Sequence, residues 1–330
     1  MGFEPRPRIL VHGLLAAHSG YGSFARGLVS GYRAAGADVS VVEGGIREVV
    51  RAVRHLRPHL LHGTMNFDFL PLRWPSLRQV ITVHDLLLTQ PIGDAPAGVR
   101  LKCRAMVWAL PAVDQIFVVS DYTRRSLPKH SRRRARVQLI GIDPALSADL
   151  AATAEPTLLF GGTPFYLYPG GAHRRKRTDF LLESFNEYRM RSGQAILVST
   201  ARLTSSPPDW LRCVPGASNQ QLAQLYRGSR GVIYPSQAEG YGLPLLEAAA
   251  AGVPALVTSS LPAAEEDPAC VAALRMPDDA SALEWALQIG RMDGRIHPIA
   301  RWTDVDNHAR WLAYAEACLI TGDGTWVRSS

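Results

Sequence analysis

Two carboxylates lie on either side of a turn in the stretch SQAEGYGLPLLE, which spans residues 236–247. An apolar run typical of a buried strand precedes this stretch, and Pro244 suits the first turn of a following helix. Glu239 therefore comes just before the turn and Glu247 about one turn into the helix, so both side chains can face one ligand. One carboxylate can accept two hydrogen bonds from a vicinal diol such as that of ribose. The other can hold a hydroxyl or a developing positive charge.

The turn between the two acids has residues suited to binding an anion. Gly240 and Gly242 allow the backbone to turn sharply and to approach a ligand closely, and Tyr241 and Leu243 belong to the same loop. Free amide groups and the positive end of the helix dipole favour a negative charge there. On physical grounds alone, an ordinary strand–turn–helix junction with an acid in its first turn explains these residues equally well.

A basic pair follows another predicted strand, in the stretch LYPGGAHRRK at residues 167–176. Arg175 and Lys176 precede a predicted helix, where a guanidinium, an ammonium and helix-end amides together could grip a diphosphate. Such a cluster would stabilise the negative charge that grows on a departing phosphate. A solvated basic turn is the alternative, and Arg174 competes with Arg175 for the role.

The first half of the chain offers a loop with two glycines. Gly20 and Gly22 permit close backbone approach to a phosphate or sugar at a helix start, although an ordinary turn explains them as well. A dinucleotide-binding fingerprint is disfavoured, because Ala25 occupies the place of its last glycine and no convincing acid follows, Glu43 being the nearest.

A histidine ends a predicted strand in the run ITVHD at residues 81–85. Ligands of parallel sheets bind at the carboxyl ends of the strands, so His84 is expected to point toward a ligand. A histidine that caps the next segment is the alternative, and Asp85 is expected to be structural.

The candidate site residues follow strands in both halves of the chain. Strand and helix patterns alternate along the chain in two successive series. We expect two Rossmann-like doubly wound α/β domains facing each other across a cleft. The domains are expected at 1–142 and 164–303, joined by a linker at 143–163, with a closing helical segment at 304–330. Expected strands are 8–11, 39–42, 59–61, 79–83, 115–119, 136–140, 165–168, 195–199, 231–234 and 254–257, and expected helices are 23–35, 178–190, 219–226 and 244–251.

The run YPSQAEGYGLPLLEAAAAGVPALV resembles the signature of retaining glycosyltransferases with the GT-B fold, of the family 4 (group 1) type. The resemblance implies that Glu239 lies against the donor sugar, that Glu247 binds the nucleotide ribose, and that Arg175 and Lys176 bind the diphosphate. It further implies that the glycine loop covers the donor diphosphate and that His84 approaches the donor sugar. Glu239, His84 and Lys176 are then the expected catalytic residues, and the closing helix crosses back onto the first domain.

The implied activity is transfer of a hexose, with retention of anomeric configuration, from GDP-mannose or a UDP-hexose. The implied acceptor is a glycan, a lipid-linked molecule or a natural product. Two alternatives stay open: a non-catalytic partner protein with the GT-B fold, and a nucleotide-sugar isomerase on the same fold. No cofactor and no metal are expected. The acids of Asp304-Val-Asp306 are interpreted as helix-start residues.

Composition narrows the class of protein and its surroundings. A net charge of +7 favours anionic partners, and four scattered cysteines without a CxxC pair indicate a cytoplasmic location. The strongly basic segment 124–136 allows a peripheral contact with the inner membrane surface, with a solvated loop as the alternative. Nucleic acid is not expected as a partner, because no stacking aromatics interleave with the basic residues. No oligomeric state is predicted.

Overall fold

The computed structural model describes residues 6–15, 19–65, 69–70, 73–74, 76–90, 95–152, 159–191, 193–270, 272–292 and 302–320. The chain divides into two compact units. The first unit comprises Met1–Pro144 with Val305–Ser330, and the second comprises Ala145–Asp304. Within the described ranges, no helix is both long and apolar enough to span a bilayer.

The first unit is built on a six-stranded sheet with the strand order β2-β1-β3-β4-β5-β6. All neighbouring strands pair in parallel, which explains why their sequences are apolar runs: both faces of the sheet are covered. The strands are β1 (Arg8–His12), β2 (Asp38–Val42), β3 (Leu60–Gly63), β4 (Arg78–Val83), β5 (Gln115–Val118) and β6 (Ala135–Val137). Each coincides with an expected strand, with small shifts at the ends.

The helices of the first unit include several that the sequence pattern did not predict. Helix α1 begins at Gly20 and not at Ser23 as expected, because Ser19 caps it by accepting a hydrogen bond from the Gly22 amide at 3.3 Å. The remaining helices are α2 (Ile46–Leu56), α3 (Ala97–Ala109), α4 (Asp121–Ser126) and α5 (Lys129–Arg132), beside α1 (Gly20–Ala34). The segment 124–136 is therefore largely helix and strand, not a loop.

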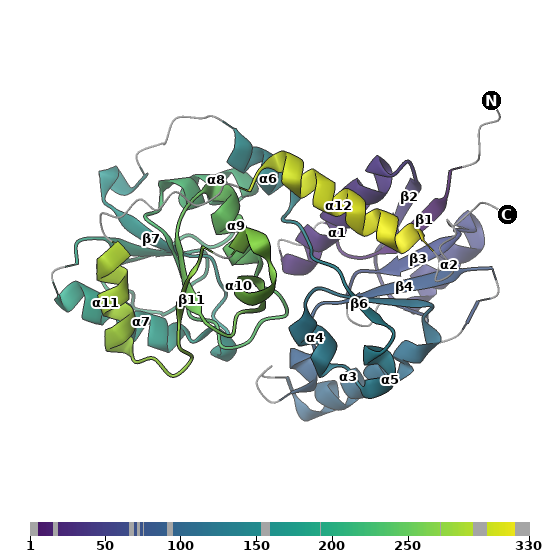
Figure 1. The fold of residues 1–330 in the computed structure, drawn as a ribbon, viewed down its shortest axis with the longest axis horizontal. Helices are drawn as coiled ribbons and strands as arrows, with labels where there is room; N and C mark the ends of the chain where they lie inside the picture. The colour runs from purple at the N-terminus through teal and green to yellow at the C-terminus, as the bar shows by residue number, and fades with distance from the viewer. Residues whose placement is uncertain are drawn as a thin grey trace. The chain divides into compact units, whose positions relative to one another are not determined.

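The closing helix α12 (Asp304–Leu319) packs on α1 within the first unit (Figure 1). Gly27 and Gly31 allow this close approach, since a Cβ at Gly27 would lie 2.1 Å from the ring of Trp311. Trp311 is 1% exposed and donates from its indole N–H to the Ile142 carbonyl at 2.8 Å. The predicted return of the C-terminal helix to the first domain is confirmed, as are the helix-start acids at Asp304.

A chain of buried polar side chains crosses the core of the first unit. His62 is fully buried and its ring nitrogens contact the Tyr32 hydroxyl and the Thr82 hydroxyl, each at 2.8 Å. Thr82 in turn meets the Tyr314 hydroxyl of α12 at 2.8 Å. Because every side chain in this network is hydrogen-bonded, the network joins α1, β3, β4 and α12 without leaving an isolated polar group in the core.

Burial makes the first unit sensitive to acid. Burial lowers the pKa of His62 to about 3 and that of His84 to about 4, so both imidazoles stay neutral in the folded protein well below pH 6.5. The unfolded chain takes up these protons below its pKa of 6.5, so stability falls as pH decreases from about 6.5 toward 4. We expect each histidine to contribute a loss of about 2 kcal/mol at pH 5 relative to pH 7.5.

Urea unfolding at several pH values measures this effect. His62→Gln should unfold with a shallower dependence of stability on pH than the wild type, whereas His130→Gln, at an exposed position, should follow the wild type. Equal slopes for the wild type and the His62 variant would contradict the prediction.

The second unit contains another six-stranded parallel sheet, ordered β12-β11-β10-β7-β8-β9. Helices α7 and α11 cover one face, and α8 and α9 cover the other (Figure 1). The predicted apolar face of α7 is confirmed, because Leu181, Phe185 and Tyr188 are all buried. The strands are β7 (Phe165–Tyr168), β8 (Ile196–Ser199), β9 (Leu211–Cys213), β10 (Val232–Tyr234), β11 (Ala255–Thr258) and β12 (Leu274–Met276). The helices are α7 (Thr178–Met190), α8 (Asn219–Gly228), α9 (Leu243–Ala251), α10 (Pro262–Glu266) and α11 (Ala282–Met292).

The segment expected as a linker, 143–163, has structure of its own in the described residues. Helix α6 (Pro144–Ala151) buries Leu146 and Leu150, and the buried Asp143 forms an ion pair with Arg26 at 2.5 Å. Residues 153–158 of the expected linker lie outside the described residues.

Candidate active site

The second unit has the strand order of a doubly wound sheet, with the direction of winding reversed between β7 and β10. The loops that leave the carboxyl ends of two such strands diverge, and ligands of α/β sheets bind in the crevice that results. Arg175 and Lys176 follow β7, in a short 3₁₀ helix, and Glu239 follows β10. The topology therefore brings together the basic pair and the first acid of the predicted motif.

Glu239 is held by four donors on one oxygen. Its Oε1 accepts hydrogen bonds from the Lys176 ammonium at 2.5 Å, the Ser236 hydroxyl at 2.6 Å and the Tyr234 hydroxyl at 2.9 Å. The Arg175 guanidinium lies 2.9 Å from the same oxygen. Among the described residues, Oε2 has no hydrogen-bond partner, so this oxygen is available to a ligand hydroxyl.

The surroundings keep Glu239 ionised although its side chain is only 11% exposed. Burial alone would raise the pKa of Glu239, but the charges of Lys176 and Arg175 outweigh it and hold that pKa below its usual value. One carboxylate between two cations leaves a net charge of +1 on the cluster. The cluster is therefore suited to an anionic ligand that brings a hydroxyl group close to it.

The structure distinguishes the two candidate arginines. Arg175 donates to the Ala238 carbonyl at 2.9 Å and accepts, at its own carbonyl, the Gln237 amide at 2.8 Å, so it ties the loop after β7 to the loop after β10. Arg174 is exposed and has no hydrogen bond or ion pair from its side chain to a described residue. The preference for Arg175 thus has a geometric basis.

Glu247 lies on α9 and is positioned by a tyrosine that the sequence analysis did not single out. Tyr226 of α8 donates to Glu247 Oε2 at 2.5 Å, and the pKa of Tyr226 is raised by burial and by the charge of Glu247. Tyr234, which binds Glu239, also raises the pKa of Tyr226. The two buried tyrosines therefore link the neighbourhoods of the two acids.

The turn from Gly240 to Leu243 has the expected form. Gly242 has a φ of +112°, which non-glycine residues rarely adopt, and α9 begins at Leu243 directly after it. The side chain of Tyr241 is 4% exposed, and its hydroxyl donates to Asp267. A contact of Tyr241 with a donor stays a prediction.

In the first unit, His84 is buried directly after β4. Its ring contacts the Thr64 carbonyl at 2.9 Å, its own carbonyl accepts from the Thr123 hydroxyl, and it is 9% exposed. The rings of Tyr21 and Phe24, which follow Gly20 and Gly22 in α1, meet it edge-on at 4.9 and 4.6 Å. The predicted histidine and the predicted glycine loop are therefore neighbours.

Glu43 has a structural role in the same unit. It follows β2 and accepts the Leu15 amide at 2.9 Å, while Arg26 donates to the Leu15 carbonyl. This acid thus holds the chain that leaves β1.

Residues 163–289 match a known family, described as glycosyl transferases group 1. This part of the chain is similar to the group 1 glycosyl transferases. The matched residues include Arg175, Lys176, Glu239 and Glu247.

A curated relative shares sequence with most of the chain. O-antigen chain mannosyltransferase B of Escherichia coli is 28% identical over 257 residues, which cover 70% of this chain and 65% of that protein. The chain thus matches just under two thirds of that relative's length.

The fold is shared with sucrose-phosphate synthase from Thermosynechococcus elongatus (TM-score 0.66, 18% identity, covering 93% of this chain and 94% of that one). It is also shared with Anabaena HepE in complex with UDP-glucose (TM-score 0.65, 13% identity, covering 94% of each chain). The predicted GT-B class of two Rossmann-like domains is confirmed.

Proposed function

We propose that the protein is a glycosyltransferase that transfers a hexose from a nucleotide sugar to an acceptor hydroxyl with retention of configuration. The observation that carries this proposal is the cluster of Arg175, Lys176 and Glu239 at the point where the winding of a group 1 sheet reverses. It offers cations for a diphosphate and a carboxylate oxygen for a sugar hydroxyl at adjoining positions.

The chemistry places little demand on a protein base. The acceptor hydroxyl attacks the anomeric carbon from the face that the diphosphate leaves, the bond from that carbon to the diphosphate breaks, and the departing phosphate takes the hydroxyl proton. Lys176 and Arg175 stabilise the negative charge that develops on the diphosphate. Glu239 binds a donor hydroxyl and stabilises positive charge at the anomeric carbon. In the first unit, His84 stays the predicted catalytic residue.

The donor is proposed to be GDP-mannose or a UDP-hexose. The relative named as an O-antigen chain mannosyltransferase favours mannose and a glycan acceptor, and the HepE structure contains UDP-glucose. Glu247, fixed by Tyr226, is proposed to bind the donor ribose. A lipid-linked molecule or a natural product is also proposed as an acceptor. The reaction is proposed to need no metal and no cofactor, and the protein is proposed to be cytoplasmic.

Product analysis tests the function. The protein is incubated with GDP-mannose or UDP-glucose and with mannosyl oligosaccharides, and free nucleoside diphosphate and elongated glycan are measured. The proposal expects both products in equal amounts, with the anomeric configuration of the donor retained in the NMR spectrum of the glycan. Donor binding without release of nucleoside diphosphate would instead indicate a non-catalytic partner protein. Conversion of the donor sugar in the absence of acceptor would indicate an isomerase.

A further inference from the structure

Helix α3 of the first unit presents two large apolar side chains to the solvent. Leu101 is 70% exposed and Trp108 is 67% exposed. They are seven positions apart, so they lie on the same side of the helix, with Arg104 and Ala105 between them, and both of these are exposed. Single exposed apolar residues are common on protein surfaces. Two large apolar side chains on the same side of one helix indicate a surface that binds another molecule.

The surrounding segment carries the positive charge of the chain. Residues 97–137 contain ten lysines and arginines and two acids, Asp114 and Asp121, which gives a net charge of +8. The whole chain has a net charge of +7, so the remaining residues together are close to neutral. The basic character that favours anionic partners is therefore located around α3, α4 and α5.

Little of this charge is neutralised by carboxylates. Arg124 and Arg125 pair with Asp121, but Arg132 and Arg134 donate to backbone carbonyls, which leave the positive charge in place. In the part of the chain that the structure describes, the side chains of Lys129 and Arg133 have no hydrogen bond or ion pair.

One ring contact joins the apolar stripe to the basic segment. Trp108 of α3 stacks on His130 of α5, with the ring centroids 5.3 Å apart and the planes inclined by 30°. Leu101, Arg104, Trp108, Lys129, His130 and Arg133 are called the α3–α5 surface below.

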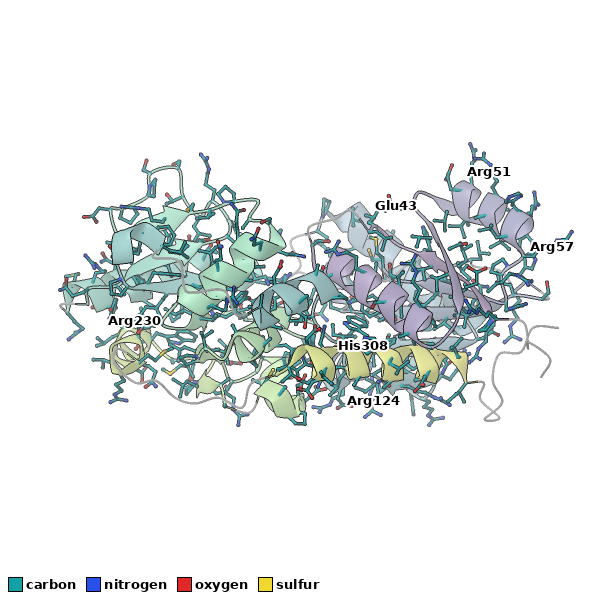
Figure 2. All side chains as sticks on the ribbon, turned by 90° about the horizontal axis from the view of Figure 1, so that it is seen from above. Glu43, Arg51, Arg57, Arg124, Arg230 and His308 are labelled. Carbon is teal, nitrogen blue, oxygen red and sulfur yellow. The ribbon has the colours of Figure 1, made fainter. Side chains whose placement is uncertain are left out.

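Helix α2 offers a useful contrast on the same unit. Arg47, Arg51 and Arg54 are exposed along it, and Figure 2 shows Arg51 extending outward from this helix. Ile46 is 53% exposed, but α2 carries no aromatic side chain. It is therefore a charged face without the aromatic and aliphatic pair found on α3.

We propose that the α3–α5 surface docks on a membrane that contains anionic lipids. Tryptophan is favoured at the boundary between headgroups and acyl chains, and a neighbouring leucine adds apolar area there. Lys129 and Arg133 then face anionic headgroups, each strengthening the attraction. An acidic polymer would use the charge but would leave Leu101 and Trp108 in water. The inference does not depend on the donor site, because all of its residues belong to the first unit.

Vesicle flotation with the whole protein tests the docking. We expect binding to vesicles of phosphatidylcholine with phosphatidylglycerol, and little binding to phosphatidylcholine alone. Lys129→Gln with Arg133→Gln should lower partitioning by about 25-fold, on the basis of roughly fivefold for each basic residue near an anionic surface. Trp108→Ala should lower it by about tenfold through lost apolar contact.

Two matched controls locate the effect. Arg47→Gln, Arg51→Gln and Arg54→Gln together remove more charge from α2, and Met190→Ala removes an apolar side chain that is 74% exposed in the second unit. Both variants should bind within about twofold of the wild type, since none of the replaced residues belongs to the α3–α5 surface. Equal losses in the α2 variant, unchanged binding of Trp108→Ala, binding to phosphatidylcholine alone, or binding to RNA in preference to vesicles would each overturn the proposal.

Discussion

Replacing Lys176 with glutamine should lower kcat by about 100- to 1000-fold. The ammonium is buried beside Glu239 and Tyr234, so it is fixed in place before a donor arrives. A group fixed in this way stabilises charge on the departing diphosphate without reorganising, which is why its loss should act mainly on turnover. Steady-state kinetics with the donor identified by product analysis measures the effect.

The exposed Arg174 supplies the control for this prediction. Arg174→Gln removes a positive charge two positions away, from an exposed side chain outside the cluster, and should leave kcat within about twofold of the wild type. Glu239→Gln should also lower kcat, whereas Glu247→Gln should mainly raise KM for the donor. Equal kinetics for the Lys176 and Arg174 variants would contradict the role given to the cluster. A melting temperature for each variant separates this result from unfolding.

The second large effect concerns stability of the first unit. Trp311→Ala should destabilise it by about 3–5 kcal/mol, the usual range for removing a large buried aromatic side chain. The ring fills the space between α12 and the glycines of α1, and its N–H satisfies the Ile142 carbonyl. Thermal or urea unfolding, followed by near-ultraviolet circular dichroism, measures the loss.

An exposed tryptophan of the same unit provides the matched substitution. Trp108→Ala should change stability by less than about 0.5 kcal/mol, because that side chain already faces solvent. If the two alanine variants unfold alike, α12 does not stabilise the first unit in the way its contacts indicate.

The sequence predicted those parts of the fold whose signal is local. Strand β7 and helix α7 appear with their expected bounds, because a fully apolar run and a regular apolar stripe each encode one element. Edge strands β9 and β12 were missed, since three residues of mixed burial give no period. Helix α3 was missed as well, because its exposed Leu101 and Trp108 blur the pattern of a single buried face.

The residues of the candidate site also differ in how far the sequence predicts their roles. The roles of Lys176 and Glu239 could be predicted from a motif, but those of Tyr234 and Tyr226 could not. Their roles depend on which residues the folded chain brings to them: Lys176 is 58 positions from Tyr234, and Glu247 is 21 positions from Tyr226. The requirement for glycine at position 27 could not be predicted from the sequence either. A side chain there is excluded only because Trp311 packs against it in the folded protein.

Calorimetric titration with GDP and with UDP tests the central claim most directly, because it asks whether the cluster at the carboxyl ends of β7 and β10 recognises a diphosphate. The wild type and Arg174→Gln should bind one of the two nucleotides with the same affinity, and Lys176→Gln should bind it at least about tenfold more weakly. Equal binding by all three proteins, or no binding of either nucleotide by the wild type, would contradict the account.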